Sequence, residues 1–121
     1  SDHAAVAVLQ KFVVAQDREN LLVLLLNGRH RALGVNLVGL GTANAGLVHP
    51  REVYKPAILA GATGIILSHT HPSGDSAPSP EDREVTKRLA EAGNILGIQL
   101  LDHIILGDPG EFFSFKEKGL L

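Results

Sequence analysis

The sequence of 121 residues has no cysteine, no tryptophan and a single tyrosine. Without cysteine, neither a disulfide framework nor a thiolate metal site can form, so a bound metal would need histidine and carboxylate ligands. Aromatic residues make up only 4% of the chain, so Leu, Ile, Val and Ala must build the core. No apolar run approaches the roughly 20 residues that span a bilayer. We therefore expect no membrane segment and, by default, a cytoplasmic location.

A strong excess of either charge is also lacking. The formal net charge is −2 and the pI is about 6.3. Domains that bind DNA or RNA mainly by electrostatics are usually strongly basic, so this balance argues against that class but leaves room for a local basic patch. The length is that of one ordinary domain, and 45% hydrophobic residues are typical of a globular chain. The sequence therefore predicts a single domain over residues 1–121.

Hydrophobic periodicity predicts a mixed α/β (α+β) fold, with a central mixed β-sheet flanked by about three helices. The run Leu21–Leu26 is continuously apolar and ends in Asn27-Gly28, which favours a buried strand followed by a hairpin turn. Pro50 suits the first turn of a helix, and Ser79-Pro80 suits the start of another. The predicted order is a helix over 1–16, strands over 21–26 and 33–40, a helix over 50–60, a strand over 64–68, a helix from 80 to between 92 and 96, and strands over 98–106 and 112–115.

Two histidines follow the short apolar strand predicted over 64–68. In an extended chain, side chains two positions apart share one face, so His69 and His71 converge while Thr70 points away. A catalytic zinc needs three protein ligands and an open position for water, so a carboxylate must complete the site. Asp82, in the first turn of the next helix, is placed to do so once the intervening loop folds back.

A purely structural explanation of the same residues is also available. A His-x-His pair alone often has nothing to do with a metal. Ser79-x-x-Asp82 resembles a helix capping box, with Pro80 in the favoured first turn. On this interpretation, Ser79 and Asp82 only satisfy the free N–H groups at the start of the helix.

The wider pattern resembles a known family. His69-x-His71-Pro72 with Ser79-x-x-Asp82 at a helix start resembles the JAMM motif of the JAB/MPN metallopeptidases, and Thr70 replaces the Asn usual in the closest branch, which should not affect ligation. That branch is the RadC-like one, to which similar segments extend from about Arg18 to the end of the chain. They are His71-Pro72-Ser73-Gly74-Asp75, His49-Pro50-Arg51-Glu52, Leu101-Asp102-His103-Ile104-Ile105 and Ser114-Phe115-x-Glu117-x-Gly119.

The resemblance implies a JAB/MPN (cytidine-deaminase-like) fold and a Zn²⁺-dependent hydrolase that attacks an amide or isopeptide carbonyl in a peptide or protein. It implies that His69, His71 and Asp82 bind the zinc. Ser79 would stabilise the oxyanion that develops on the substrate. It also implies that the chain is the C-terminal part of a longer one.

A glutamate early in such domains acts as general base and returns the proton to the leaving amine. Glu19, just before the first predicted strand, matches that position best. If it is not catalytic, Glu19 is an exposed loop carboxylate. Glu52 is the second choice, although a carboxylate in the first turn of a helix is already favoured by the helix dipole.

Five other polar residues have two interpretations each. Asp75 either shapes the loop turn or orients a ligand histidine, and the turn is the better expectation. Asp102 and His103 are either a buried pair that supports the fold or the site, or an exposed pair. His49 and Arg51 either contact substrate or lie on the surface at a helix start.

Two other functions compete with hydrolysis of a peptide bond. The RadC-like branch is associated with DNA repair, which suggests a nucleic-acid-interacting or nuclease module fused to a DNA-binding segment. The near-neutral charge and the shortage of aromatic residues give that view little support. The third possibility is a metal-free module, which the filled ligand positions disfavour. The sequence does not indicate the oligomeric state.

Overall fold

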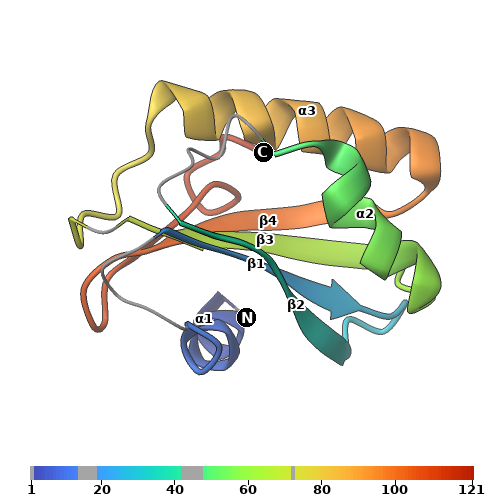
Figure 1. Ribbon diagram of the computed structural model, residues 1–121, viewed down its shortest axis with the longest axis horizontal. Helices are drawn as coiled ribbons and strands as arrows, with labels where there is room; N and C mark the ends of the chain where they lie inside the picture. Colours follow the sequence, from blue (N-terminus) through green and yellow to red (C-terminus); the bar gives the residue numbers. More distant parts are fainter. Residues whose placement is uncertain (1, 14–18, 42–47, 72) are drawn as a thin grey trace.

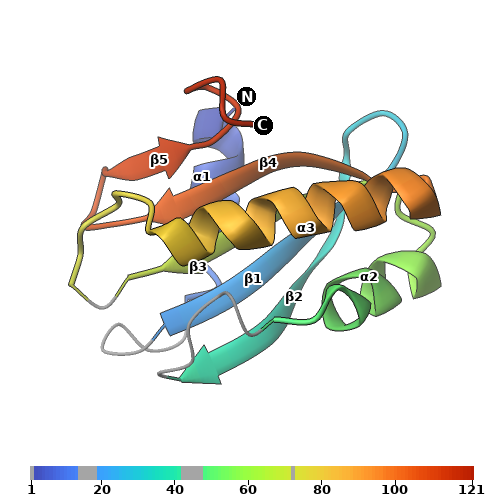
Figure 2. The ribbon, with the colours of Figure 1, turned by 90° about the horizontal axis from the view of Figure 1, so that it is seen from above.

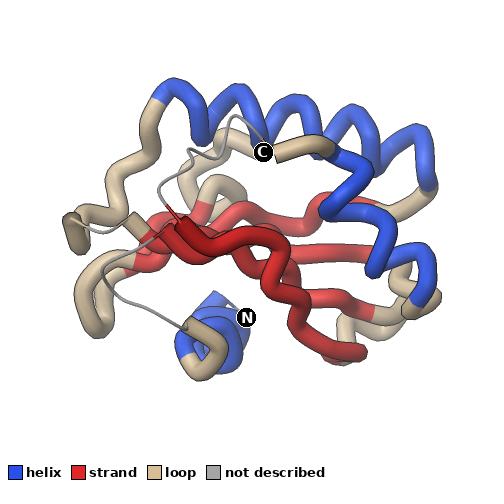
Figure 3. Tube along the Cα trace, viewed as in Figure 1, coloured by secondary structure: helices blue, strands red, loops and turns tan. Residues whose placement is uncertain are grey.

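The computed structural model describes residues 2–13, 19–41, 48–71 and 73–121. Within them, five strands form one sheet in the order β2-β1-β3-β4-β5, with α1 on one face and α2 and α3 on the other (Figures 1 and 3). The predicted mixed α/β fold with a central sheet and three helices is confirmed. The elements are α1 Asp2–Gln10, β1 Glu19–Leu26, β2 Ala32–Gly41, α2 Pro50–Leu59, β3 Gly64–Thr70, α3 Pro80–Leu96, β4 Gln99–Leu106 and β5 Phe112–Ser114.

Strand β1 lies between β2 and β3 and is antiparallel to both, whereas β3 and β4 are parallel. The predicted hairpin between β1 and β2 is present. Asn27 closes its turn by accepting the N–H groups of Arg29 and Arg31. The parallel pair needs a long crossover, which α3 provides. As a result, the carboxyl end of β3 and the amino end of α3 lie at the same end of the molecule (Figure 2).

Strand β1 explains why its sequence is apolar without interruption. Leu21, Val23 and Leu25 pack with α2 and α3, and the alternating residues Leu22 and Leu24 pack with α1 on the other face. Each fully buried Leu or Val side chain stabilises the fold by about 1.5–3 kcal/mol relative to exposure. A strand covered by helices on both faces therefore reads as a continuous hydrophobic run.

Strand β4 contains a β-bulge that changes which side chains face α3. Ile65 pairs with Leu100, but the next residue, Ile66, pairs with Asp102, so Leu101 is an extra residue. After the bulge, His103 pairs with Leu67 and shares its face of the sheet. The alternation of β4 is therefore shifted by one residue beyond Leu101.

The helix predicted over 1–16 is shorter than expected. It ends at Gln10. It is followed by hydrogen bonds of the tighter 3₁₀ type, such as those from Lys11 N–H to Val8 C=O and from Phe12 N–H to Leu9 C=O. Residue 1 and residues 14–16 of that prediction lie outside the described part of the chain. In the residues that the structure covers, no helix is long and apolar enough to cross a membrane.

Candidate metal centre

The candidate site forms where β3 ends and α3 begins. His69 is fully buried. It lies on the face of β3 that α3 covers, because its paired neighbour Leu21 and its strand neighbour Leu67 belong to the core beneath α2 and α3. His71 follows the end of the strand and is 20% exposed. The loop after it returns to Ser79, which caps α3, so that Asp82 in the first turn of the helix points back to the strand end.

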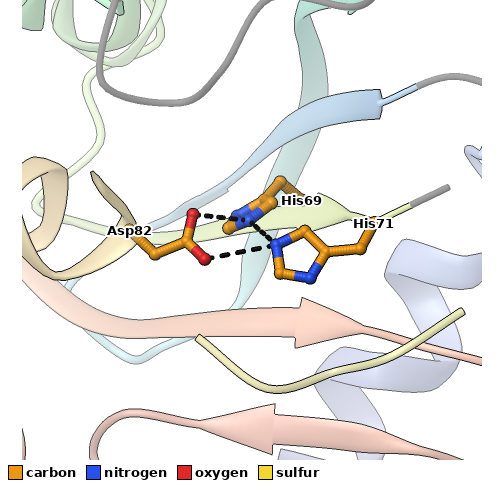
Figure 4. Close-up of side chains that lie close together, drawn as sticks. All are labelled: His69, His71 and Asp82. Atoms are coloured by element: carbon orange, nitrogen blue, oxygen red, sulfur yellow. Dashed lines mark hydrogen bonds and ion pairs between the residues drawn. The ribbon is translucent and has the colours of Figure 1, made fainter. Parts of the chain in front are cut away.

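Three side chains meet at this point (Figure 4). Asp82 Oδ1 lies 2.9 Å from His69 Nε2, and Asp82 Oδ2 lies 3.2 Å from His71 Nε2. The two Nε2 atoms are 2.9 Å apart. Two imidazole nitrogens and one carboxylate therefore converge, and their ligand atoms all lie within 4.8 Å of one another.

The donor set fits a divalent metal ion. Zinc holds nitrogen and oxygen ligands at about 2.0–2.2 Å, so tetrahedral ligand atoms stand roughly 3.3–3.6 Å apart. The distances between these donors are slightly shorter, and a small outward shift of the rings would accommodate the ion. Two imidazoles and a carboxylate suit zinc and also ferrous iron.

Asp82 takes part in the cap of α3 and at the same time faces the two histidines. The Asp82 N–H donates to Ser79 Oγ at 3.1 Å, and the Ser79 N–H donates to Asp82 Oδ2 at 2.7 Å. The predicted capping box is thus confirmed. It fixes the carboxylate in the orientation that faces the histidines, so it does not compete with metal binding. Ser79 Oγ acts here as an acceptor, which leaves its own proton to donate.

The Asp82 carboxylate and the His71 ring stabilise each other's charged forms. Burial by itself raises the pKa of the Asp82 carboxyl, but hydrogen bonds from His69 and His71 outweigh burial and hold that pKa well below its usual range. Conversely, the hydrogen bond to Asp82 raises the pKa of His71 against the opposing effect of burial. Asp82 is therefore a carboxylate at neutral pH, as a metal ligand must be.

Glu19 lies at the same end of the sheet. Leu21 pairs with His69, so the same register continued by two residues sets Glu19 opposite His71, on the face that carries His69. Its carboxyl group is half-buried, and burial raises its pKa, while the nearby histidines His69 and His71 lower it. Thr70 anchors this end of β1, because its Oγ1 accepts the Asn20 N–H at 2.9 Å.

The loop holds His71 by its main chain. His71 Nδ1 lies 2.8 Å from the carbonyl oxygen of Asp75, which can only accept, so Nδ1 carries the proton. The Asp75 side chain accepts the Ala77 N–H at 2.9 Å and so closes a turn. Asp75 shapes the loop with its side chain, as expected, and orients the histidine with its carbonyl group.

Behind His69 lie two buried residues. His103 Nε2 is 2.8 Å from His69 Nδ1, and His103 Nδ1 contacts Thr86 Oγ1. Thr86 in turn donates to the carbonyl oxygen of Asp82 at 2.8 Å. Burial lowers the pKa of His103 well below its usual value, so its ring is neutral. Sequence reasoning missed Thr86, although its position four residues after Asp82 puts both on one face of α3.

The remaining candidates lie elsewhere or have other partners. His49 caps α2, since its Nδ1 accepts the Arg51 N–H at 3.0 Å, and Glu52 is exposed in the first turn of that helix. Asp102 is buried and accepts hydrogen bonds from Ser114 Oγ and from main-chain N–H groups that include that of Lys116. In the described part of the chain, none of these belongs to the group formed by His69, His71 and Asp82.

Comparison with known sequences gives an independent result. The chain matches the RadC-like JAB domain over residues 1–120. It is similar to the UPF0758 proteins of Rubrobacter xylanophilus (52% identical over 105 residues) and Moorella thermoacetica (54% over 105 residues), with 87% of this chain and 45% of each of those proteins covered. It is 55% identical over 104 residues to the UPF0758 protein of Desulforudis audaxviator, with 86% and 45% covered.

The chain thus spans less than half the length of these curated relatives. The match to the domain covers almost every residue, and it agrees with the resemblance seen in the motifs around His69, Asp82 and His103. The protein therefore belongs to the RadC-like JAB domain family.

Proposed function

We propose that this domain is a zinc-dependent hydrolase that cleaves an amide or isopeptide bond in a peptide or protein. The observation that carries the proposal is the convergence of His69 Nε2, His71 Nε2 and the Asp82 carboxylate on one point. Both histidines present the same ring nitrogen, and the carboxylate is held in its ionised form by its surroundings.

A zinc ion with an open position would polarise the substrate carbonyl and lower the pKa of water, so that a nucleophile is available at neutral pH. Glu19 would accept a proton from the attacking water and pass it to the leaving amine nitrogen as the carbon–nitrogen bond breaks. Ser79 would donate its hydroxyl proton to the oxygen on which negative charge develops. The capping bond supports this role, because it orients Ser79 Oγ and uses only its lone pair.

A cavity of about 340 Å³ lies beside His71 and is lined by Gln10 of α1, Thr70 of β3, Leu106 of β4 and the β4–β5 turn; His69 and Asp82 do not line it. The peptide or protein substrate and the cytoplasmic location remain predictions.

Metal binding is the first property to test. Zinc content measured by elemental analysis should be close to one ion per chain in the wild type and near zero in His69→Ala. His30→Asn is the matched control, because His30 lies in the β1–β2 turn at the far end of the sheet. Its φ of 58° is a conformation that Asn tolerates. A wild type that takes up no zinc after addition of the ion contradicts the proposal.

Hydrolysis is tested separately with Glu19→Gln. This variant should keep its zinc, because Glu19 is outside the ligand group, and should lose at least about 100-fold in rate on a peptide or isopeptide substrate. Single-stranded and double-stranded DNA belong in the same screen. No observation among the described residues favours a nuclease, and the net charge of −2 argues against one. Zinc-dependent cleavage of DNA alone would show that the proposed substrate class is wrong.

A further inference from the structure

A continuous set of hydrogen bonds lies behind the candidate centre. It runs from His69 Nδ1 to His103 Nε2 at 2.8 Å, from His103 Nδ1 to Thr86 Oγ1, and from Thr86 Oγ1 to the carbonyl oxygen of Asp82 at 2.8 Å. We call these four residues the buried network. All four are at most 2% exposed, and both ends of the network are residues of the centre itself.

The direction of each hydrogen bond follows from the one group that cannot donate. A carbonyl oxygen only accepts, so the Thr86 hydroxyl gives its single proton to Asp82. Thr86 Oγ1 then accepts from His103, whose proton must be on Nδ1. A neutral imidazole with its proton on Nδ1 has its lone pair on Nε2, so His103 Nε2 accepts the Nδ1 proton of His69.

His69 therefore keeps its proton on Nδ1, so Nε2, the atom that faces Asp82 and His71, is the nitrogen that can give its lone pair to a metal. We propose that His103 and Thr86 are positioning residues that fix the tautomer and the ring orientation of His69 for metal binding. The inference rests on the zinc site of the proposed function. It assigns no contact with substrate to either residue.

The bulge in β4 is what brings His103 to this place. Leu100 packs beneath α2 and α3, and His103, three positions later, lies on the same face because Leu101 is an extra residue. Strict alternation from Leu100 would turn His103 toward α1 and away from His69. Bulges next to functional sites commonly redirect a side chain in this way. Phe115 then stacks on the His103 ring with centroids 4.6 Å apart and fixes its plane.

Two matched pairs of variants test the proposal. His103→Leu removes the acceptor for His69, whereas His103→Gln keeps an amide oxygen within reach of the same position. Thr86→Val removes the hydroxyl at nearly constant shape, whereas Thr86→Ser keeps it. Zinc affinity measured by competition with a chelating dye should fall about 10–100-fold in His103→Leu and less in Thr86→Val, as for other partners of ligand histidines. His103→Gln and Thr86→Ser should stay near the wild type.

A second measurement needs neither a variant nor a metal. In the metal-free wild type, ¹⁵N NMR of the imidazoles should show His69 and His103 both protonated on Nδ1, and His103 unprotonated on Nε2. The absence of a proton on Nδ1 of His69, or unchanged zinc affinity in both His103→Leu and Thr86→Val, would overturn the proposal. The expected tautomers in a protein that binds no zinc would support the network and contradict the proposed function instead. The opposite tautomer in a protein that binds zinc would do the reverse.

Discussion

The two histidines of the candidate centre are held in different ways. His69 is on a central strand, is fully buried, and is fixed by side chains from β4 and α3. His71 lies beyond the strand end, is 20% exposed, and is fixed by the carbonyl group of Asp75 in its own loop. The centre therefore has a strand half, which is His69, and a loop half, which is His71, and both present Nε2. Rigid elements position ligands more accurately than loops, and loops adapt more readily to a bound ion or substrate.

Asp82 joins the two halves, and its substitution should have the largest effect. Asp82→Asn still offers an oxygen to the Ser79 N–H, so the cap survives and the free energy of unfolding of the metal-free protein should fall by about 1 kcal/mol or less. The amide carries no charge, so zinc retention should be nearly abolished. Elemental analysis and urea unfolding measure the two quantities. Full zinc retention in Asp82→Asn would mean that the carboxylate is only a cap.

Gly74→Ala should weaken the loop half specifically. Gly74 has a φ of 81°, and a side chain there would also collide with Asp108. The left-handed conformation costs a non-glycine residue about 1–2 kcal/mol. The loop that carries His71 should therefore shift, and zinc affinity should fall by up to about 10-fold. Gly61→Ala is the control, because Gly61 has a similar φ and open space around it at the far end of β3. An equal loss of affinity in Gly61→Ala would show that the effect is general destabilisation.

Asp75→Ala should have a smaller effect than either His103→Leu or Gly74→Ala. The substitution removes the side-chain acceptor of the Ala77 N–H, but the main-chain carbonyl that holds His71 remains. We expect less than about a 10-fold loss of zinc affinity by dye competition. A loss as large as that in His103→Leu would mean that the two halves do not differ as proposed.

Tyr54→Phe should change stability and leave zinc binding unaltered. The Tyr54 hydroxyl donates to the Leu89 carbonyl at 2.7 Å between α2 and α3, so its loss should cost about 0.5–1.5 kcal/mol. Burial raises the pKa of Tyr54 from 10.0 to about 12. The stability that it contributes is therefore fully present below pH 10 and is lost as the pH rises toward 12. Unfolding at pH 8 and pH 11 should show a smaller difference between the two proteins at pH 11.

Much of the fold followed from the sequence because local patterns agreed with tertiary packing. The apolar run Leu21–Leu26 predicts a strand covered on both faces, and Ser79-Pro80 predicts a helix start, and both are present. The first helix was expected to be longer, because apolar spacing continues past the residue where the helix changes to tighter turns. Spacing alone does not mark such an end.

The convergence of the site was only partly predictable. The spacing of His69 and His71 and the cap at Ser79 indicated where the two histidines and Asp82 would meet. Thr86 had a signal in the sequence, because it follows Asp82 by four residues on one face of α3. The inward position of His103 was not predictable from alternation. A bulge adds one residue to β4, and every later side chain changes face. Such a shift depends on pairing with another strand, which the sequence of β4 does not reveal. The roles of Glu19 and Ser79 stay predictions.

The most direct test of the central claim is a calorimetric zinc titration of the metal-free wild type beside Asp82→Asn and the distant control His30→Asn. We predict one site per chain in the wild type and in His30→Asn, and no measurable binding in Asp82→Asn. The absence of binding in the wild type, or equal binding in all three proteins, would contradict the assignment of His69, His71 and Asp82 as a metal centre.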